Sequence, residues 1–434
     1  MNIAIVGVTG KVGRTFVQVI QERNIKADNF YCFASARSAG SKVNLFGKDY
    51  EVIELTEENV KKYQIDYALF SAGGSISLKF APIFAKQGAI VIDNSSAFRT
   101  HDDVPLVVPE VNPEDILWNN GIIANPNCST IQAIVPVKAL DDKFKIKRII
   151  YSTYQAVSGA GQKGYADLEN GIKGEAPKKF PYPIFSNVLP HIDDFLDTGY
   201  TKEEQKMIFE TRKILHNQDL KVTATTARVP VFDCHSESIN VEFYNEAPIE
   251  EVKEVLRNAE GVVLQDDVKN LVYPMPYTAV GKDEIFVGRV RQDFSVDSGI
   301  NMWVVADNIR KGAASNAIQI VEKLITKRTD ALSLYYSGYA DKEDTKTIIE
   351  KITTDYLRDE DLANIDRFFQ SDLEQINGYK ITEIDITSAD EDVICAYVTI
   401  DWNSQNYEEE ENFIHTYSTI CKKEENLYKL AQFF

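Results

Sequence analysis

IAIVGVTGKVG, residues 3–13, is the stretch that decides the fold of this chain. It opens with the continuous apolar run of a buried parallel strand, passes through three glycines, and leads into helical apolar spacing over residues 14–20. A strand, a glycine turn and a helix in this order can hold a dinucleotide, because the backbone can approach the pyrophosphate and the helix N-terminus favours its charge. The GxxGxxG spacing is less specific than GxGxxG, so a glycine turn without a ligand is the alternative.

Further apolar strands that end in small or polar loops follow this stretch. They lie within residues 30–38, 67–75, 89–99 and 122–132. Ligands of open parallel sheets bind at the carboxyl ends of the strands, so we expect these loops to meet at one crevice. The first loop carries Arg37 where a NAD site usually has an acidic residue. This favours the 2′-phosphate of NADP, with a solvated surface arginine as the alternative.

Cys128 stands in the last of these loops, in NPNCSTIQ at residues 125–132. The pattern predicts a thiol on a turn that opens a helix. The free backbone N–H groups and the dipole of such a helix lower the pKa of a thiol, and the thiolate is the nucleophilic form. The alternative is a buried cysteine that only packs. The other cysteines, Cys32, Cys234, Cys395 and Cys421, form neither a paired framework nor a metal-ligand spacing, so we expect no bound metal.

Length and charge divide the 434 residues into two or three domains. From residue 146 the strands are partly alternating and indicate a mixed sheet, and residues 312–327 return to a helix of the first pattern. Residues 331–434 hold 9 Lys and Arg against 23 Asp and Glu, which gives −14 of the total net charge of −19. This charge break predicts a separate acidic module. Helices are expected at 346–356 and 361–375, and strands at 381–386, 393–402, 413–421 and 427–433.

The charge and the hydropathy exclude several classes of protein. A net charge of −19 argues against binding to nucleic acid, and no apolar run is long enough to span a membrane. The N-terminus lacks the features of a signal peptide. The chain is therefore expected to be cytoplasmic.

Nine motifs in order make residues 1 to about 328 similar to the aspartate-semialdehyde dehydrogenase family. They are GVTGKVG (7–13), SARSAG (35–40), FSAGGS (70–75), DNSSAFR (93–99), VPEVN (108–112), NPNCSTIQ (125–132), STYQAVSGAG (152–161), RVPVFDCHSES (228–238) and MWVVADNIRKGAA (302–314). The resemblance implies an enzyme that converts L-aspartyl 4-phosphate to L-aspartate 4-semialdehyde with NADPH through a cysteine thioester. It would act in lysine, threonine and methionine biosynthesis.

The resemblance also implies roles for individual residues. Cys128 would be the nucleophile, His235 would manage a proton near the sulfur, and Gln155 would orient the acyl intermediate. The predicted substrate ligands are Arg228 for the α-carboxylate, Glu203 for the amino group, and Arg99, Asn127 and Lys206 for the phosphate. The predicted NADP-binding residues are Gly7, Thr9, Gly10, Lys11, Val12, Ser35, Arg37, Ser38, Ser71, Gly73, Ser158, Gly159 and Asn308. Apart from the resemblance, His235 is as readily a core histidine, the role that we expect for His101, His191, His216 and His415.

The expected fold is α/β, with three parts. Residues 1–127, completed by a helix at 308–328, form a Rossmann-type parallel sheet that binds NADP. Residues 128–307 form an α+β catalytic and dimerisation domain with a mixed sheet. Residues 332–434 form a small accessory α+β domain, faintly similar to nuclear-transport-factor-2-like domains, with an oligomerisation or regulatory role. A homodimer or homotetramer is expected, although the loop at 162–183 is shorter than in many members and could change the dimer contact.

Two other functions stay open. One is another acyl-phosphate or acyl-thioester reductase of the same architecture, such as N-acetyl-glutamyl-phosphate reductase or malonyl-CoA reductase. The former family surrounds its cysteine differently. The second is a non-catalytic regulatory protein that kept the fold and works through its tail, which the presence of Cys128, Gln155, Arg228 and His235 argues against.

Overall fold

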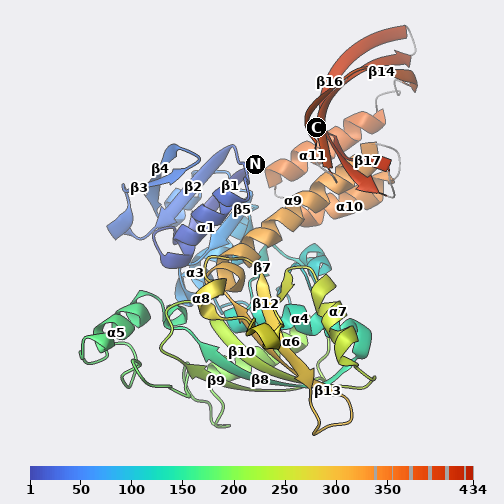
Figure 1. Cartoon of the computed structure of the whole chain (residues 1–434). Helices are drawn as coiled ribbons and strands as arrows, with labels where there is room; N and C mark the ends of the chain where they lie inside the picture. The colour runs from blue at the N-terminus through green and yellow to red at the C-terminus, as the bar shows by residue number, and fades with distance from the viewer. Residues whose placement is uncertain are drawn as a thin grey trace. The chain divides into compact units, whose positions relative to one another are not determined.

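The computed structural model describes residues 1–336, 340–353, 355–370, 375–389, 393–405, 410–424 and 427–433. These residues divide into two compact units, 1–359 and 360–434, which are described separately (Figure 1). The first unit contains two sheets, and the second contains one. The three predicted domain boundaries at 127/128, 307/308 and 331/332 stay predictions.

The N-terminal sheet has seven strands in the order β3-β4-β2-β1-β5-β6-β7. All neighbours are parallel except β3 and β4, which form a hairpin. The strands are β1 (Asn2–Val6), β2 (Asn29–Ala34), β3 (Lys42–Leu45), β4 (Lys48–Glu54), β5 (Tyr67–Phe70), β6 (Ile90–Asp93) and β7 (Ile122–Ala124). The chain crosses from one side of β1 to the other between β4 and β5. Open sheets bind their ligands at such a crossover point.

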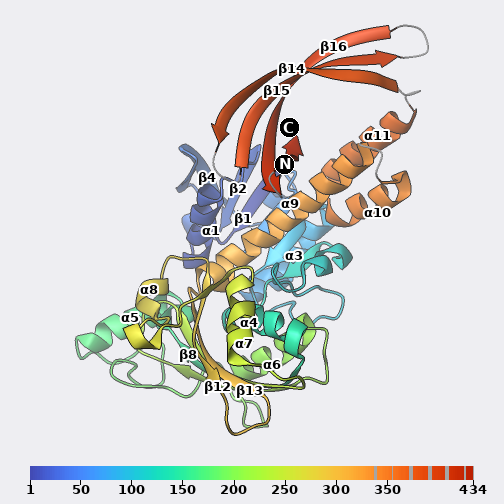
Figure 2. The same ribbon diagram turned by 45° about the vertical axis from the view of Figure 1, so that its right-hand side comes forward.

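Helices cover both faces of this sheet, as its uniformly apolar strands require. Phe16 of α1 and Ile318 of α9 pack on one face, where α9 runs beside the sheet in Figure 2, and Phe84 of α3 packs on the other. The helices and short turns of this layer are α1 (Lys11–Glu22), η1 (Ala36–Ser38), α2 (Glu57–Val60), α3 (Gly74–Lys86), η2 (Pro113–Trp118), η5 (Arg310–Ala314) and α9 (Ser315–Tyr336). A helix from residues 315–336 thus completes the N-terminal layer.

The second sheet is mixed and has the order β11-β12-β13-β10-β8-β9. Its parallel pairs are β8 with β9 and β11 with β12, and the other neighbours are antiparallel. The strands are β8 (Ile146–Gln155), β9 (Lys221–Arg228), β10 (His235–Phe243), β11 (Val262–Leu264), β12 (Ile285–Gln292) and β13 (Gly299–Ala306). The predicted fold class, a Rossmann-type sheet with a mixed-sheet second domain, is confirmed.

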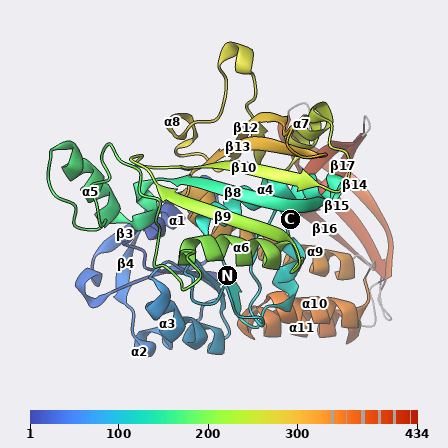
Figure 3. The same cartoon turned by 90° about the horizontal axis from the view of Figure 1, so that it is seen from below.

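Three helices pack on one face of the second sheet, as Figure 3 shows from below. Ile134 of α4, Met207 of α6 and Val252 of α7 join the buried side chains of this face in one apolar core. The helices and turns of this layer are α4 (Cys128–Phe144), η3 (Val157–Ala160), α5 (Gln162–Ile172), α6 (Lys202–Ile214), α7 (Ile249–Asn258), η4 (Val268–Asn270) and α8 (Pro276–Ala279). The N-termini of α4 and α6 carry the side chains of the site described below.

The helix that follows α9 is built into the N-terminal layer. In α10 (Lys342–Ile352), Ile352 is fully buried in the same apolar cluster as Tyr67 and Ile116. Asn119 Nδ2 also donates a hydrogen bond of 2.8 Å to the carbonyl of Lys351. This helix was predicted at 346–356, but it starts earlier because Asp341 caps it, and it ends earlier because residue 353 is extended.

The second unit contains an antiparallel sheet, curved in Figure 2, in the order β14-β15-β16-β17. The remaining elements are α11 (Asp355–Gln370), β14 (Gln375–Ala389), β15 (Val393–Gln405), β16 (Glu410–Glu424) and β17 (Leu427–Phe433). The helix predicted at 361–375 is displaced, since residue 375 already begins β14 and residues 371–374 lie outside the described part. Bulges within β14 interrupt its period of two, so the sequence pattern indicated only 381–386.

In the part of the chain that the structure describes, every helix is too short or too polar to cross a bilayer.

Candidate active site

Cys128 is the first residue of α4, where the chain turns from β7 into the helix. Asn127 caps the helix, because its Oδ1 accepts hydrogen bonds from the N–H groups of Ser129 at 3.0 Å and Thr130 at 3.3 Å. On the other side, Gly312 of the π-helical turn η5 lies so close that an added Cβ would stand 2.9 Å from Cys128 Cβ. Such π-turns often occur at functional sites. The turn and the cap therefore hold the thiol in one place.

His235, at the start of β10, faces the thiol. Its Nε2 lies 3.3 Å from Cys128 Sγ, and its Nδ1 accepts a hydrogen bond of 3.0 Å from the N–H of Ala156. Nδ1 therefore carries no proton, and the neutral ring holds its proton on Nε2. Burial lowers the pKa of His235 well below its usual value, and the cation of Arg228 lowers it further. At neutral pH the imidazole is a hydrogen-bond donor to the sulfur.

The prediction of a lowered thiol pKa is wrong for this structure. Burial raises the pKa of Cys128 to about 12, and the negative charge of Glu203 acts in the same direction. Arg99, Arg228 and the N–H of Ser129 lower it, but by less. The sequence shows the helix N-terminus, whereas the desolvation that outweighs it depends on the tertiary fold.

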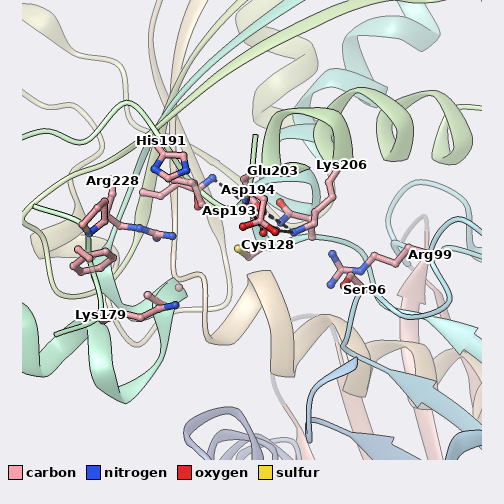
Figure 4. Close-up of a pocket in the computed structure, with 17 residues that line it drawn as sticks. Ser96, Arg99, Cys128, Lys179, His191, Asp193, Asp194, Glu203, Lys206 and Arg228 are labelled. Carbon is pink, nitrogen blue, oxygen red and sulfur yellow. Dashed lines mark hydrogen bonds and ion pairs between the residues drawn. The ribbon is translucent and has the colours of Figure 1, made fainter. Parts of the chain in front are cut away.

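A cavity of about 650 Å³ opens beside Cys128 and contains all the predicted substrate ligands (Figure 4). Figure 4 shows Arg99 on one side of the thiol, and Arg228 with Lys179 on the other. Cations thus face the sulfur from two directions, as a substrate with two separate anionic groups requires. The predicted residues in its lining are Arg99, Asn127, Cys128, Gln155, Glu203, Lys206 and Arg228.

Glu203 is the buried anion at the centre of this cavity. Its Oε1 accepts hydrogen bonds from Asn127 Nδ2 at 2.9 Å and from Gln155 Nε2 at 3.2 Å, and Lys206 Nζ lies 3.2 Å from its Oε2. Burial favours the neutral acid, but the cation of Lys206 and the two amides outweigh it and lower the pKa of Glu203. The carboxylate is therefore charged at neutral pH and available to a cationic group of a ligand.

Glu210 fixes the side chains on the opposite edge of the cavity, and sequence reasoning missed it. It lies one and two turns beyond Lys206 and Glu203 on the same face of α6. Its Oε1 pairs with Arg99 at 3.2 Å, and its Oε2 accepts a hydrogen bond of 2.6 Å from the N–H of Asn127. The spacing of two helical turns from Glu203 to Glu210 was the feature of the sequence that could have indicated this residue. Only the fold shows that this face of α6 is buried.

Sequence reasoning also missed the loop that precedes α6. Asp193 pairs with Lys206 at 2.7 Å, and His191 lines the cavity with its ring stacked on Phe195. His191 was expected to be a core histidine, which is wrong. The same expectation is wrong for His101 and His216, which are exposed, and the side chain of His415 lies outside the described residues. No motif in the sequence indicated where the fold would place these histidine side chains.

A second cavity meets the first at Cys128. It lies at the N-terminus of α1, whose cap residue Gly10 has no side-chain hydrogen bond, so that N–H groups of the first turn are free. Gly7 has φ +85°, and a Cβ here would stand 2.3 Å from the carbonyl oxygen of Ser71. The predicted cofactor ligands in its lining are Thr9, Gly10, Lys11, Val12, Ser71, Ser158, Gly159 and Asn308.

Hydrogen bonds at this cavity connect loops at the ends of three strands of the second sheet, and one ion pair joins these loops to α1 of the N-terminal layer. Asn308 Oδ1 accepts hydrogen bonds from Ser158 Oγ at 3.0 Å and from the N–H of Cys234 at 3.1 Å. Lys11 Nζ pairs with Asp233 at 2.9 Å and lies 3.8 Å from the ring centre of Tyr165. Tyr165 reaches Lys11 from α5 and had no sequence signal, and Asp233 stands in the motif at 228–238, where nothing indicated that it would pair with Lys11.

The remaining predicted cofactor residues, Gly7 among them, lie outside the lining of this cavity. Ser35 and Arg37 are exposed at the end of β2, and Thr9 Oγ1 lies 3.5 Å from Ser38 Oγ. Gly73 precedes α3 with φ +89°. The exposed Ser35 and Arg37 and the half-buried Ser38 thus form a polar edge next to Thr9, a cavity residue.

Two family models match the chain. The semialdehyde dehydrogenase NAD binding domain matches residues 2–118, and the semialdehyde dehydrogenase dimerisation domain matches residues 137–311. Aspartate-semialdehyde dehydrogenase of Aquifex aeolicus is 57% identical over 333 residues, which are 75% of this chain and 98% of that protein.

Solved structures agree with these matches. Aspartate semialdehyde dehydrogenase II complexed with ASA from Vibrio cholerae has a TM-score of 0.71 and 46% identity, and covers 75% of this chain and 98% of its own. The enzyme with NADP from Candida albicans has a TM-score of 0.58 and 27% identity, and covers 74% of this chain and 98% of its own. The two family models match residues on both sides of Cys128. The chain belongs to the aspartate-semialdehyde dehydrogenase family.

Proposed function

We propose that this chain reduces L-aspartyl 4-phosphate to L-aspartate 4-semialdehyde with NADPH through a thioester on Cys128, in the biosynthesis of lysine, threonine and methionine. The observation that carries the proposal is the position of Cys128 Sγ. It lies 3.3 Å from His235 Nε2, where a cavity rich in charged side chains meets a cavity at the N-terminus of α1. An acyl-phosphate reductase needs both an anionic substrate and a hydride-donating cofactor at one sulfur.

The substrate cavity offers a partner to each charged group of L-aspartyl phosphate. Arg228 presents a planar guanidinium to the α-carboxylate, and Glu203 presents a charged carboxylate to the amino group. Arg99, Asn127 and Lys206 surround the position left for the phosphate. Gln155, which already donates to Glu203, orients the acyl group.

The first chemical step forms a bond between Cys128 Sγ and the acyl carbon, and the bond from that carbon to the phosphate oxygen breaks. The thiol is protonated in the resting site, so its proton leaves with the phosphate as hydrogen phosphate. His235 need not act as a base. Its Nε2–H faces the sulfur, where a donor stabilises the negative charge that develops during the attack.

The second step requires a cofactor, and the residues around the second cavity fit one. The tight glycine turn at Gly7 and the free N–H groups of α1 suit a pyrophosphate, and Ser158, Gly159 and Asn308 extend the lining to Cys128. The nicotinamide cofactor, when bound, supplies the hydride that reduces the thioester. His235 Nε2–H would donate a hydrogen bond to the oxyanion on the former acyl carbon. When the C–S bond breaks, the aldehyde forms and Cys128 leaves as a thiolate, which takes up a proton from solvent to restore the thiol.

Preference for NADP over NAD is the finer part of the proposal. Arg37, Ser35 and Ser38 stand at the end of β2, where an acidic residue would repel a 2′-phosphate. We expect Arg37→Ala to weaken NADP at least tenfold and to leave NAD within about twofold, since it removes one charge-assisted contact. Equal losses for the two cofactors, measured as the ratio of kcat/KM, would remove Arg37 from the 2′-phosphate site.

Self-association through the second sheet is also proposed. The face of this sheet opposite α4 and α6 carries Tyr154, which is 40% exposed, with its ring 5.4 Å from that of Trp303. Leu271 and Tyr277 are exposed on nearby segments. The proposed assembly is a homodimer or homotetramer, and Trp303→Glu should shift the mass measured by light scattering toward the monomer. An unchanged mass would place the contact elsewhere. Location in the cytoplasm stays a prediction.

For residues 332–434 we still propose an accessory role, in oligomerisation or regulation. Because Ile352 is buried with Tyr67 and Ile116, a chain that ends at residue 331 loses part of the core of the N-terminal layer, whereas one that ends at 353 keeps it. We expect the shorter chain to unfold at a lower temperature than the longer one. If mass, kinetics and feedback response are unchanged in the chain that ends at 353, residues 354–434 have neither an oligomerisation nor a regulatory role.

The function is tested by following NADP reduction with L-aspartate 4-semialdehyde and phosphate. The rate should depend on phosphate and disappear in Cys128→Ala, while Cys32→Ala, a buried cysteine in the N-terminal core, stays active. Activity with an acyl-CoA instead of the acyl phosphate would favour another reductase of this architecture. A folded protein that is inactive with all these substrates would favour a non-catalytic role.

A further inference from the structure

Glu237 is a buried acid that the proposed chemistry leaves without a role. It stands two residues after His235 on β10, so both side chains lie on the helix-covered face of the central strand. Its neighbours across the sheet are Thr153 and Val304. It is fully buried, and among the residues that the structure describes neither carboxyl oxygen has a well-formed hydrogen bond, although the amide of Gln132 acts on it. A charged carboxylate in this environment would cost several kcal/mol.

The groups around Glu237 favour its neutral form. Burial raises its pKa well above the usual value, and the negative charge of Glu203 on α6 raises it further, while the amide of Gln132 lowers it by less. The other titratable side chain with an electrostatic interaction with Glu237 is Tyr151, on the adjacent strand β8. No cation acts on Glu237, so nothing replaces the lost hydration of an anion. A neutral acid differs from an anion in one respect: it has an O–H to donate.

Gln132 provides the matching acceptor. It lies one helical turn beyond Cys128 on α4, and its Oε1 is buried and has no donor among the described residues. Its Nε2 donates a hydrogen bond of 3.3 Å to the carbonyl of His235. A proton on Glu237 would give both of these oxygens a partner, because the O–H of a carboxylic acid can donate to an amide oxygen. Buried polar groups without a partner are unfavourable.

We propose that Glu237 is a positioning residue that works as an uncharged acid: its O–H donates to Gln132 Oε1, and Gln132 holds the helix that carries Cys128 against the strand that carries His235. The link runs from Glu237 through the amide to the backbone of His235, whose Nε2 lies 3.3 Å from Cys128 Sγ. Glu237 touches neither substrate nor cofactor. It acts by fixing the distance between the two reacting side chains, and this role rests on the proposed roles of Cys128 and His235.

Infrared spectroscopy tests the protonation state without any turnover. The difference spectrum between wild type and Glu237→Gln at neutral pH should contain the C=O band of a protonated carboxylic acid, shifted in D2O. The control is Glu242→Gln on the same strand, because Glu242 pairs with Lys147 at 2.6 Å and should give carboxylate bands. Carboxylate bands in the Glu237→Gln spectrum would overturn the uncharged acid.

Kinetics tests the positioning role. Glu237→Gln keeps a neutral donor and should stay within about threefold of wild type in kcat, whereas Glu237→Leu should lose about ten- to a hundredfold in kcat with KM nearly unchanged. If Glu237→Leu does not fold, Gln132→Leu interrupts the same link and should show the same pattern. A folded Leu variant with full kcat overturns the proposal, and so does a Gln variant that loses as much as the Leu variant.

The rate at which iodoacetamide alkylates Cys128 separates this proposal from the proposed function. It should change in Glu237→Leu and remain near the wild-type rate in Glu237→Gln. If the wild type proves inactive as a dehydrogenase, this pattern still reports the position of the thiol. If the enzyme is active and alkylation is the same in all three proteins, the link through Gln132 is wrong while the function stands.

Discussion

The two cavities that meet at Cys128 are made in different ways. The cofactor cavity depends on backbone, since the close approach of Gly7 to Ser71 and the free N–H groups of α1 shape it. The substrate cavity depends on charged side chains, since Glu203 and Lys206 of α6 and Arg228 of β9 all line it. The two cavities share Arg99, Asn127, Cys128 and Gly159 in their linings. The difference teaches that substitutions should damage the first through steric strain and the second through unpaired charge.

The largest effect is expected in the substrate cavity. Arg228→Lys keeps the positive charge but removes the planar guanidinium that can bind a carboxylate through two hydrogen bonds. It also removes the hydrogen bond of 2.7 Å that Arg228 Nη1 donates to the carbonyl of Ala156. We expect kcat/KM to fall about a thousandfold, because a buried ionic contact is left incomplete. Arg289→Lys is the control, since Arg289 lies on the opposite face of the sheet. A loss below tenfold would mean that the planar fork of Arg228 is not needed to bind the substrate.

The next effect separates the glycines of the cofactor cavity. A Cβ at Gly13 would stand 2.1 Å from the carbonyl oxygen of Gly7, whereas one at Gly10 would stand 3.2 Å from it. We expect Gly13→Ala to lower the free energy of unfolding by about 1–3 kcal/mol and to weaken NADP binding. Gly10→Ala should change stability by less than about 1 kcal/mol. Denaturant titration of both variants measures the difference, and equal losses would show that the strain is not local to Gly13.

The smallest effect concerns the loop that borders the substrate cavity. Asp193 pairs with Lys206 at 2.7 Å, but Asp193 is about one-third exposed and solvent screens the pair. We expect Asp193→Asn to raise KM for phosphate about two- to fivefold without changing kcat, because Lys206 keeps Glu203 as a partner. Steady-state kinetics at several phosphate concentrations tests this. A large fall in kcat would mean that Asp193 takes part in the chemistry.

The thiol and imidazole connect the two cavities through their pKa values. The folded protein raises the pKa of Cys128 to about 12, above the usual thiol range, so the thiolate fraction should increase with pH throughout the alkaline range. We expect the rate of alkylation by iodoacetamide to rise up to the highest pH at which the protein stays folded. His235, whose pKa is lowered, should add no step near pH 6.5. A plateau at neutral pH would show a thiolate–imidazolium pair instead.

The cofactor cavity was easier to predict because its features are local in the sequence. Gly7, Gly10 and Gly13 follow one strand within seven residues, and their spacing alone indicates a turn before a helix. The sequence also placed Cys128 at a helix N-terminus. The direction of its pKa shift could not be predicted, because burial of the thiol depends on η5 and α6 as well as on α4.

The substrate cavity was predicted only through the family resemblance. Glu203 and Lys206 look like ordinary surface-helix residues in the sequence, and Glu210 and Asp193 carried no motif. Their roles depend on the face of α6 that packs toward α4, which periodicity alone does not specify. The helices of the acidic tail were displaced in the sequence prediction for a similar reason, since the cap at Asp341 outweighed the apolar pattern.

The central claim is that Cys128 carries the acyl group, and mass spectrometry tests it most directly. Wild type incubated with L-aspartyl 4-phosphate and no cofactor should gain the mass of one aspartyl group on the peptide that contains Cys128. The modification should be absent in Cys128→Ala, present in Cys32→Ala, and lost from the wild type when NADPH is added. A folded, active wild type that accumulates no adduct, or an adduct on another residue, would contradict the claim.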